Sequence, residues 1–360
     1  MAPAHRAEWF AAKDPYHLSL ITYHLSRSQG NEMLKIDTHA HWFPPQWVDL
    51  VAKEGGKNGA EVTVEGGKIT KMTGPGVNRN GFAPQYVEMS IRLKLMDEGR
   101  VDMHALSLTS PMVYWAKPEF GLKLSQVFND ACAEAHLKQP NRFVGMAMIP
   151  MQAPELAVQE LNRAAKLPGI RGIYMATHIN GKNLDEKEFW PVYERCEALG
   201  LPIFLHPTAP LGKERMRKYH LGNFIGNPAE SGVAAASLVF GGVMDACPKL
   251  DIMLPHAGGV FPWLIGRMDH GTTVRKECKH MKQPPSAYLR RFHYDTITHS
   301  DPILVNLIRH VGADRVVMGS DCPADMSYTR PVDVVERLAE LSEAERGGIM
   351  GGNAARLLRL

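Results

Sequence analysis

Two histidines near the start of the chain have the spacing of a metal site. His39 and His41 stand two residues apart at the end of a predicted short strand, in the sequence IDTHAH. Side chains two apart in a strand point to the same face, so both imidazoles would aim at one point. Imidazole is the commonest protein ligand of divalent metals. In a chain with 16 His such a pair also arises by chance, and an exposed pair at a strand end is the competing interpretation.

Three more residues of metal-binding type follow other predicted strands. His206 ends the run IFLH, His256 ends IMLPH, and Asp321 ends VVMGSD. Each of them alone is more often a structural or turn residue than a ligand. Together with His39 and His41, however, they fall at the C-terminal ends of four strands, which is where barrel enzymes assemble their active sites. We therefore expect these five side chains to meet.

The elements that would position these residues form a regular series. Eight hydrophobic runs predict strands, each followed by a helical pattern. The expected strands are 35–39, 103–108, 142–149, 170–177, 202–206, 250–256, 292–297 and 315–321. Such alternation favours a single (β/α)₈ barrel. A doubly wound open sheet is the alternative, but it more often has a glycine-rich turn after strand 1, and residues 37–45 contain no glycine.

Two segments stand outside this series. Residues 55–81 contain two β-forming runs around Gly66-Gly67, which predict a small β-hairpin inserted after strand 1. Residues 1–33 are expected to be an N-terminal arm, with Met33 as a second candidate start, and 34–360 to be the barrel domain. The first 30 residues lack the apolar stretch and cleavage site of a secretory signal.

The composition is that of an ordinary globular protein. Hydrophobic residues make up 44% and the formal net charge is +3, so neither nucleic acid nor a membrane surface is an expected partner. The sequence contains no run of about 18 apolar residues, so no membrane span is predicted. The five cysteines have no paired or metal-binding spacing, which favours free thiols in the cytoplasm.

From Ile36 to its end, the chain resembles the metal-dependent amidohydrolase superfamily. The resemblance rests on H-x-H at strand 1, His at strands 5 and 6, and Asp at strand 8. Within the superfamily the chain is similar to the branch that contains 2-amino-3-carboxymuconate-6-semialdehyde decarboxylase. The most specific segments are MVYWAKPE (112–119), PMQAPE (150–155) and GGVFPWLIGR (258–267). The family fold is a distorted (β/α)₈ barrel with a small β insertion after strand 1.

The resemblance implies a role for each of the five polar residues. His39, His41, His206 and Asp321 would bind one divalent metal ion, and His256 would be the acid/base residue beside it, with Asp321 counted among the catalytic groups. Many members bridge two metals with a lysine on strand 4, and this strand has none, which favours a single ion. Zn²⁺ suits three imidazoles and a carboxylate, and Mn²⁺ is the alternative.

The resemblance also implies a small carboxylate substrate held by arginine. Arg79 is the best match to an arginine after the insertion, although a solvated loop residue is an equal alternative. Arg267 and Arg275 lie where the family takes an arginine from the neighbouring subunit, which implies a homodimer, and a structural ion pair competes for Arg267. Trp115 is expected to line the substrate pocket.

The leading functional prediction is a metal-dependent, non-oxidative decarboxylase of an unsaturated or aromatic acid, similar to aminocarboxymuconate semialdehyde or a hydroxybenzoate. A hydrolase that uses metal-bound hydroxide is the second, and a barrel that holds metal only for stability is the third. After His206 the chain has Pro207-Thr208-Ala209 where the branch has Pro-Trp-Asp. The substrate is therefore expected to differ from that of the named branch member.

Overall fold

The computed structural model describes residues 33–360 of the chain. The expected N-terminal arm at 1–33 thus lies outside the described residues, apart from Met33 itself. In the described part, no helix is long and apolar enough to cross a membrane.

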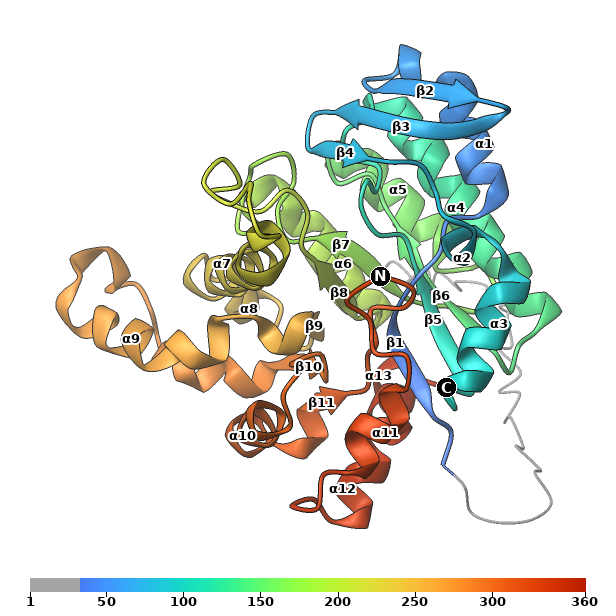
Figure 1. Ribbon diagram of the computed structural model, residues 1–360. Helices are drawn as coiled ribbons and strands as arrows, with labels where there is room; N and C mark the ends of the chain where they lie inside the picture. The colour runs from blue at the N-terminus through green and yellow to red at the C-terminus, as the bar shows by residue number, and fades with distance from the viewer. Residues whose placement is uncertain (1–32) are drawn as a thin grey trace, which may run out of the picture. The chain divides into compact units, whose positions relative to one another are not determined.

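A sheet of parallel strands forms the centre of the described residues (Figure 1). Its eight strands are β1 (Ile36–His41), β5 (Met103–Ser107), β6 (Phe143–Met148), β7 (Ile170–Ala176), β8 (Ile203–His206), β9 (Ile252–Leu254), β10 (Phe292–Asp295) and β11 (Val316–Val317). Each strand pairs with the strand before it in this order. This sequential order is that of a barrel and not of a doubly wound sheet, whose order reverses.

The segment after β11 closes the ring against β1. The backbone N–H of Thr38 donates to the carbonyl of Met318 at 3.0 Å, and that of His41 to Cys322 at 2.7 Å. In the other direction, the N–H of Asp321 donates to the carbonyl of His39 at 2.9 Å. The predicted distorted (β/α)₈ barrel is therefore confirmed, and its distortion lies in the short strands near the end of the chain.

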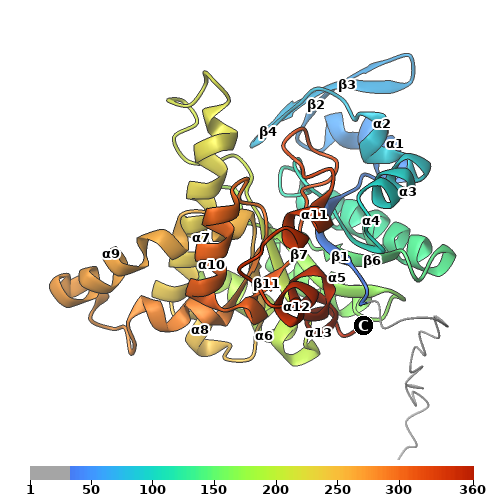
Figure 2. The same ribbon diagram turned by 60° about the horizontal axis from the view of Figure 1, so that its bottom comes forward.

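The helices lie around the outside of the strands (Figure 2). In the described residues they are α1 (Pro45–Glu54), α2 (Pro84–Val87), α3 (Met89–Glu98), α4 (Pro118–Lys138), α5 (Pro154–Ala164), α6 (Trp190–Leu199), α7 (Asn227–Phe240), α8 (Val243–Ala246), α9 (Phe261–Val274), α10 (Asp301–Val311), α11 (Pro331–Glu336), α12 (Glu343–Gly347) and α13 (Asn353–Leu358). Proline opens α1, α4 and α5, where its missing N–H costs nothing and its fixed φ suits the first turn.

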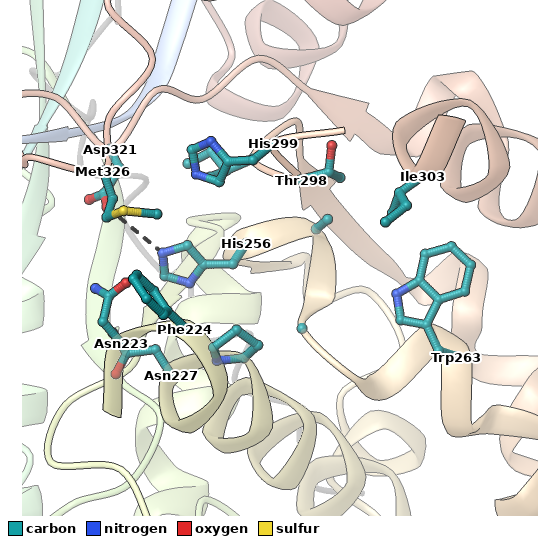
Figure 3. A pocket seen from close by; sticks show the side chains of 14 residues that line it. Asn223, Phe224, Asn227, His256, Trp263, Thr298, His299, Ile303, Asp321 and Met326 are labelled. Carbon is teal, nitrogen blue, oxygen red and sulfur yellow. Dashed lines mark ion pairs between the residues drawn. The ribbon is translucent and has the colours of Figure 1, made fainter. Parts of the chain in front are cut away.

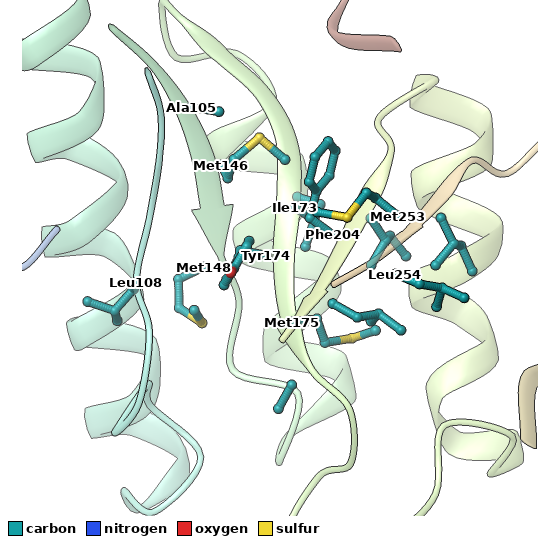
Figure 4. Packing of buried hydrophobic residues seen from close by; sticks show 14 of the residues in the cluster. Ala105, Leu108, Met146, Met148, Ile173, Tyr174, Met175, Phe204, Met253 and Leu254 are labelled. Atoms are coloured by element: carbon teal, nitrogen blue, oxygen red, sulfur yellow. The ribbon is translucent and has the colours of Figure 1, made fainter. Parts of the chain in front are cut away.

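The strands are buried on both faces, as parallel barrel strands must be. Figure 4 shows Met146, Ile173, Phe204 and Met253 from four neighbouring strands packed together. All four side chains are fully buried. This packing explains why the strands read as nearly continuous apolar runs, and it provides a rigid support for the residues at their C-terminal ends.

The insertion at 55–81 contains one strand more than the predicted hairpin. The hairpin is present as β2 (Glu61–Glu65) and β3 (Lys68–Gly74), with the turn at Gly66-Gly67 in positive φ. A third antiparallel strand, β4 (Val77–Arg79), pairs with β3. With only three residues, it has too short an alternation to be recognised from sequence.

Candidate metal centre

Four of the five predicted residues form a compact donor cluster. His39, His206, His256 and Asp321 each place one ligand atom within 4.8 Å of the others. The fifth residue, His41, lies against the same group: its Nε2 is 2.9 Å from Asp321 Oδ1, and its ring centroid is 4.7 Å from that of His206. The sequence prediction that these five side chains meet therefore agrees with the geometry, and the cluster is a metal-binding site.

His256 and Asp321 lie beyond the strands, His256 at the start of a short 3₁₀ helix (His256–Gly258) and Asp321 in a loop. The sequence placed them at the ends of strands 250–256 and 315–321, but β9 ends at Leu254 and β11 at Val317. Their φ angles are 51° and 65°, in the left-handed region that non-glycine residues rarely adopt. Residues held in this way cost free energy and are typical of functional sites.

His39 is fixed by a carboxylate behind it. Its Nδ1 donates to Asp295 Oδ2 at 2.8 Å, and both side chains are fully buried. Its other nitrogen, Nε2, is buried without a hydrogen-bond partner and lies 3.4 Å from Asp321 Oδ1. With the proton on Nδ1, the lone pair of Nε2 faces the cluster, which is the arrangement of a metal-binding histidine.

His41 is fixed in the same sense by a hydroxyl. Its Nδ1 is 3.0 Å from Ser107 Oγ, and this hydroxyl donates its own proton to the carbonyl of Ala40 at 3.0 Å. Ser107 must therefore accept from Nδ1–H, and the bare Nε2 of His41 faces Asp321. A lone pair and a carboxylate oxygen at 2.9 Å repel each other unless a cation or a proton lies near both. The donor set thus fits a divalent metal ion.

The electrostatics of the site point the same way. Burial lowers the pKa of His41 to about 4 and lowers the pKa of His206 well below its usual value, so both rings are neutral ligands. Burial also opposes charging of His39, but its hydrogen bond to Asp295 and the charge of Asp321 outweigh this and raise its pKa. The carboxylates of Asp295 and Asp321 therefore favour a positive charge beside His39.

Asp295 is the main site residue that the sequence prediction missed. One oxygen accepts from both His39 Nδ1 and the backbone N–H of His256, at 2.8 and 2.9 Å. The other accepts the N–H groups of Ala257 and Ile297, at 2.8 and 3.1 Å. Its position at the end of β10 was the available signal, because it is where the other candidate residues were sought.

A buried polar network also supports the back of β1. Arg92 of α3 donates to the backbone carbonyl of His41 and lies 3.1 Å from His104 Nδ1. Asp37 accepts the N–H of His39 at 3.0 Å and the hydroxyl and N–H of Ser320. These contacts tie the strand that carries His39 and His41 to the residue preceding Asp321. The sequence prediction did not identify Arg92, Asp37 or Ser320 as supports of the site.

The predicted substrate residues do not gather in this single chain. Arg79 is half-buried, with its guanidinium 4.6 Å from the ring centre of Phe43 and its Nη1 donating to the carbonyl of Ser110 at 2.8 Å. Trp115 is buried and lines a neighbouring cavity with His178, apart from the donor cluster. Arg267 and Arg275 are exposed on α9 and at its end.

A cavity of about 230 Å³ opens beside the donor cluster. His256 and Asp321 form part of its wall, and Figure 3 shows His256 near its centre, with Nε2 3.9 Å from Asp321 Oδ2. Aromatic and aliphatic side chains, including Phe224, Trp263 and Ile303, line much of the rest. An apolar pocket with a few converging polar groups is the usual form of a small-molecule site.

Comparisons with known proteins agree with this geometry. A family model described as Amidohydrolase matches residues 36–360. A 2-amino-3-carboxymuconate-6-semialdehyde decarboxylase from Dictyostelium discoideum is 34% identical over 91% of this chain and 92% of the relative. A gamma-resorcylate decarboxylase from a Polaromonas species is 33% identical over 75% of this chain and 86% of the relative. A dihydroxybenzoic acid decarboxylase from Polaromonas, solved with manganese and the inhibitor 2-nitroresorcinol, matches with a TM-score of 0.73 and 28% identity over 91% of this chain and 98% of that one.

Proposed function

The chain belongs to the amidohydrolase family, and from this we propose that it is a metal-dependent, non-oxidative decarboxylase of an aromatic or unsaturated carboxylic acid. The observation that carries the proposal is the donor cluster facing the apolar cavity through His256 and Asp321. Similarity to decarboxylases of such acids, over 91% of this chain for one and 75% for another, supports the reaction class.

We assign the metal ligands as His39, His41, His206 and Asp321. His256 also belongs to the donor cluster, but we assign it as the acid/base residue because the family resemblance implies this role and its side chain lies at the cavity, with Nε2 3.9 Å from Asp321 Oδ2. A bound divalent ion would polarise a substrate oxygen and stabilise negative charge that develops during the reaction. We propose Zn²⁺ as the ion because it suits this donor set. Mn²⁺ is the alternative, and the Polaromonas structure contains manganese.

His256 supplies the proton in this proposal. Its side chain is partly exposed to the cavity, and its Nδ1 is without a hydrogen-bond partner among the described residues. The imidazolium would give its proton to the carbon that bears the carboxylate. A π electron pair of the ring or conjugated chain forms the new C–H bond. The bond between this carbon and the carboxylate then breaks, its electron pair restores the π bond, and CO₂ leaves.

The cavity lacks a cation for the substrate carboxylate. Within residues 33–360 its lining contains neither lysine nor arginine. Arg267 and Arg275 are exposed, so a second copy of the chain could place one of them at the cavity, which is why we propose a homodimer. Arg79 and Trp115 are assigned as more distant substrate contacts on the side of the insertion.

All five cysteines are free, and four of them are buried. Unpaired thiols are typical of reducing compartments, so we place the protein in the cytoplasm.

The experiment that tests the reaction class is a product analysis. Purified protein of known metal content is incubated with carboxylated phenols and muconate semialdehydes, and released CO₂ is measured. A decarboxylase releases CO₂ in proportion to acid consumed, without oxygen from water in the organic product. A hydrolase that uses the same cluster would instead place ¹⁸O from labelled water in the product, and this result would overturn the proposal.

A further inference from the structure

Two amides interrupt the apolar wall of the cavity beside His256. Asn223 and Asn227 line the same cavity as His256 and Asp321. In the view of Figure 3 both amides lie at the end of the cavity where Asp321 is, while Trp263 and Ile303 lie at the other end. The two amides therefore lie on the same side of the cavity as Asp321, and the large side chains of Trp263 and Ile303 lie on the opposite side (Figure 3).

Both asparagines are held through the backbone and leave their side chains unused. The N–H of Asn223 donates to the carbonyl of His220 at 2.9 Å, and the carbonyl of Asn227 accepts from Ser231 Oγ at 3.1 Å. Within residues 33–360 neither side-chain amide makes a hydrogen bond with another residue of the chain. Each amide therefore has two donors and an acceptor available to a ligand.

The local helix geometry brings the two amides together. Asn223 lies in a π-helical turn over Gly222–Gly226, and Asn227 begins α7 directly after it. Residues four apart in a helix share a face, and a single π turn of this kind is frequent at functional sites. The half-exposed Phe224 adjoins them and contributes to the same cavity.

We propose that Asn223 and Asn227 form a hydrogen-bonding subsite for a hydroxyl or amino substituent of the substrate ring, and so determine which acids this enzyme accepts. The inference rests on the proposed function and narrows it. With the carboxylate at the donor cluster and the ring toward Trp263, a substituent next to the carboxylate would lie at the amides. An analogue without it would not make these hydrogen bonds, which is a basis for discrimination between the two acids.

The test compares ligand pairs in wild-type protein and in volume-matched variants. Binding of 2-hydroxybenzoate and of benzoate to the metal-loaded protein is measured by calorimetry, for wild type, Asn223→Leu and Asn227→Leu. We expect the dissociation constant of wild type to be at least tenfold lower for 2-hydroxybenzoate than for benzoate. In each leucine variant the two constants should become nearly equal. Asn306→Leu, on the exposed face of α10, is the control and should keep it.

The two proposals fail in different ways. Equal binding of both acids by wild type overturns the subsite, and so does a preference that survives in both leucine variants with unchanged metal content and melting temperature. Neither result depends on turnover. CO₂ release by wild type, measured in parallel, tests the proposed reaction alone. Because the preference is first measured in wild type, a variant that fails to fold does not remove the test.

Discussion

His39 donates from Nδ1 to Asp295 Oδ2 at 2.8 Å, in a pair that is completely buried. The same carboxylate accepts the backbone N–H of His256, so one side chain orients a proposed ligand and the turn that carries the proposed proton donor. Asp295→Asn should lower metal affinity by about 10- to 100-fold, because an amide cannot accept all of these hydrogen bonds. Metal titration followed by elemental analysis measures this directly.

Asp49→Asn is the matched control, since Asp49 is exposed on α1. A metal affinity in Asp295→Asn equal to that of this control would show that the carboxylate does not orient His39.

Replacing His256 tests its assignment as proton donor. His256→Ala should reduce kcat by about 10²- to 10⁴-fold, the usual contribution of a general acid, while the bound metal is retained. Rates of CO₂ release and metal content are measured on the same samples. His270→Ala, exposed on α9, should leave both unchanged. Full turnover in His256→Ala would remove this residue from the mechanism, and loss of the metal would make it a ligand.

Removal of the metal should abolish activity and lower stability together. Without a cation, the bare Nε2 of His41 and the Asp321 carboxylate face each other at 2.9 Å inside the protein. A ligand at 100 times its dissociation constant stabilises the folded state by about 2.7 kcal/mol, so dialysis against a chelator should lower the melting temperature. Zn²⁺ and Mn²⁺ are then added back separately. Metal-free protein with undiminished activity would contradict the assignment.

Subunit mixing tests whether Arg267 acts in a neighbouring site. His256→Ala and Arg267→Ala should each be nearly inactive alone. In a mixed dimer one site combines a wild-type His256 with the partner copy's wild-type arginine, so an equal mixture should recover about a quarter of the wild-type activity. The mixture is refolded or co-expressed, and its CO₂ release is compared with that of each parent. No recovery, despite mixed dimers shown by mass spectrometry, would place Arg267 outside the partner's site.

The barrel and most of the donor cluster could be predicted from the sequence because both follow simple rules. Buried parallel strands are nearly continuous apolar runs, and site residues follow their C-terminal ends. His39, His41 and His206 lie in strands, so their positions followed from strand position alone.

The remaining features depend on contacts that no local pattern contains. β9 ends at Leu254 and β11 at Val317, and the left-handed φ of His256 and Asp321 beyond them leaves no mark in the apolar pattern, so the strands were predicted too long. Serine is a common residue, so Ser107 does not stand out in the sequence. Its contact with His41 Nδ1 exists only because β5 pairs with β1. Arg267 lies on an exposed face of α9, so its proposed role depends on contacts with a second copy of the chain.

The closure of the barrel also constrains biosynthesis. The site joins His39 and His41, near the beginning of the described residues, to Asp321, which is held against them by the bond from its N–H to the His39 carbonyl. A ribosome must therefore synthesise the chain through residue 321 before all four proposed ligands can come together. Until then the three histidines lack the carboxylate that completes the proposed ligand set, so the full site forms only late in synthesis.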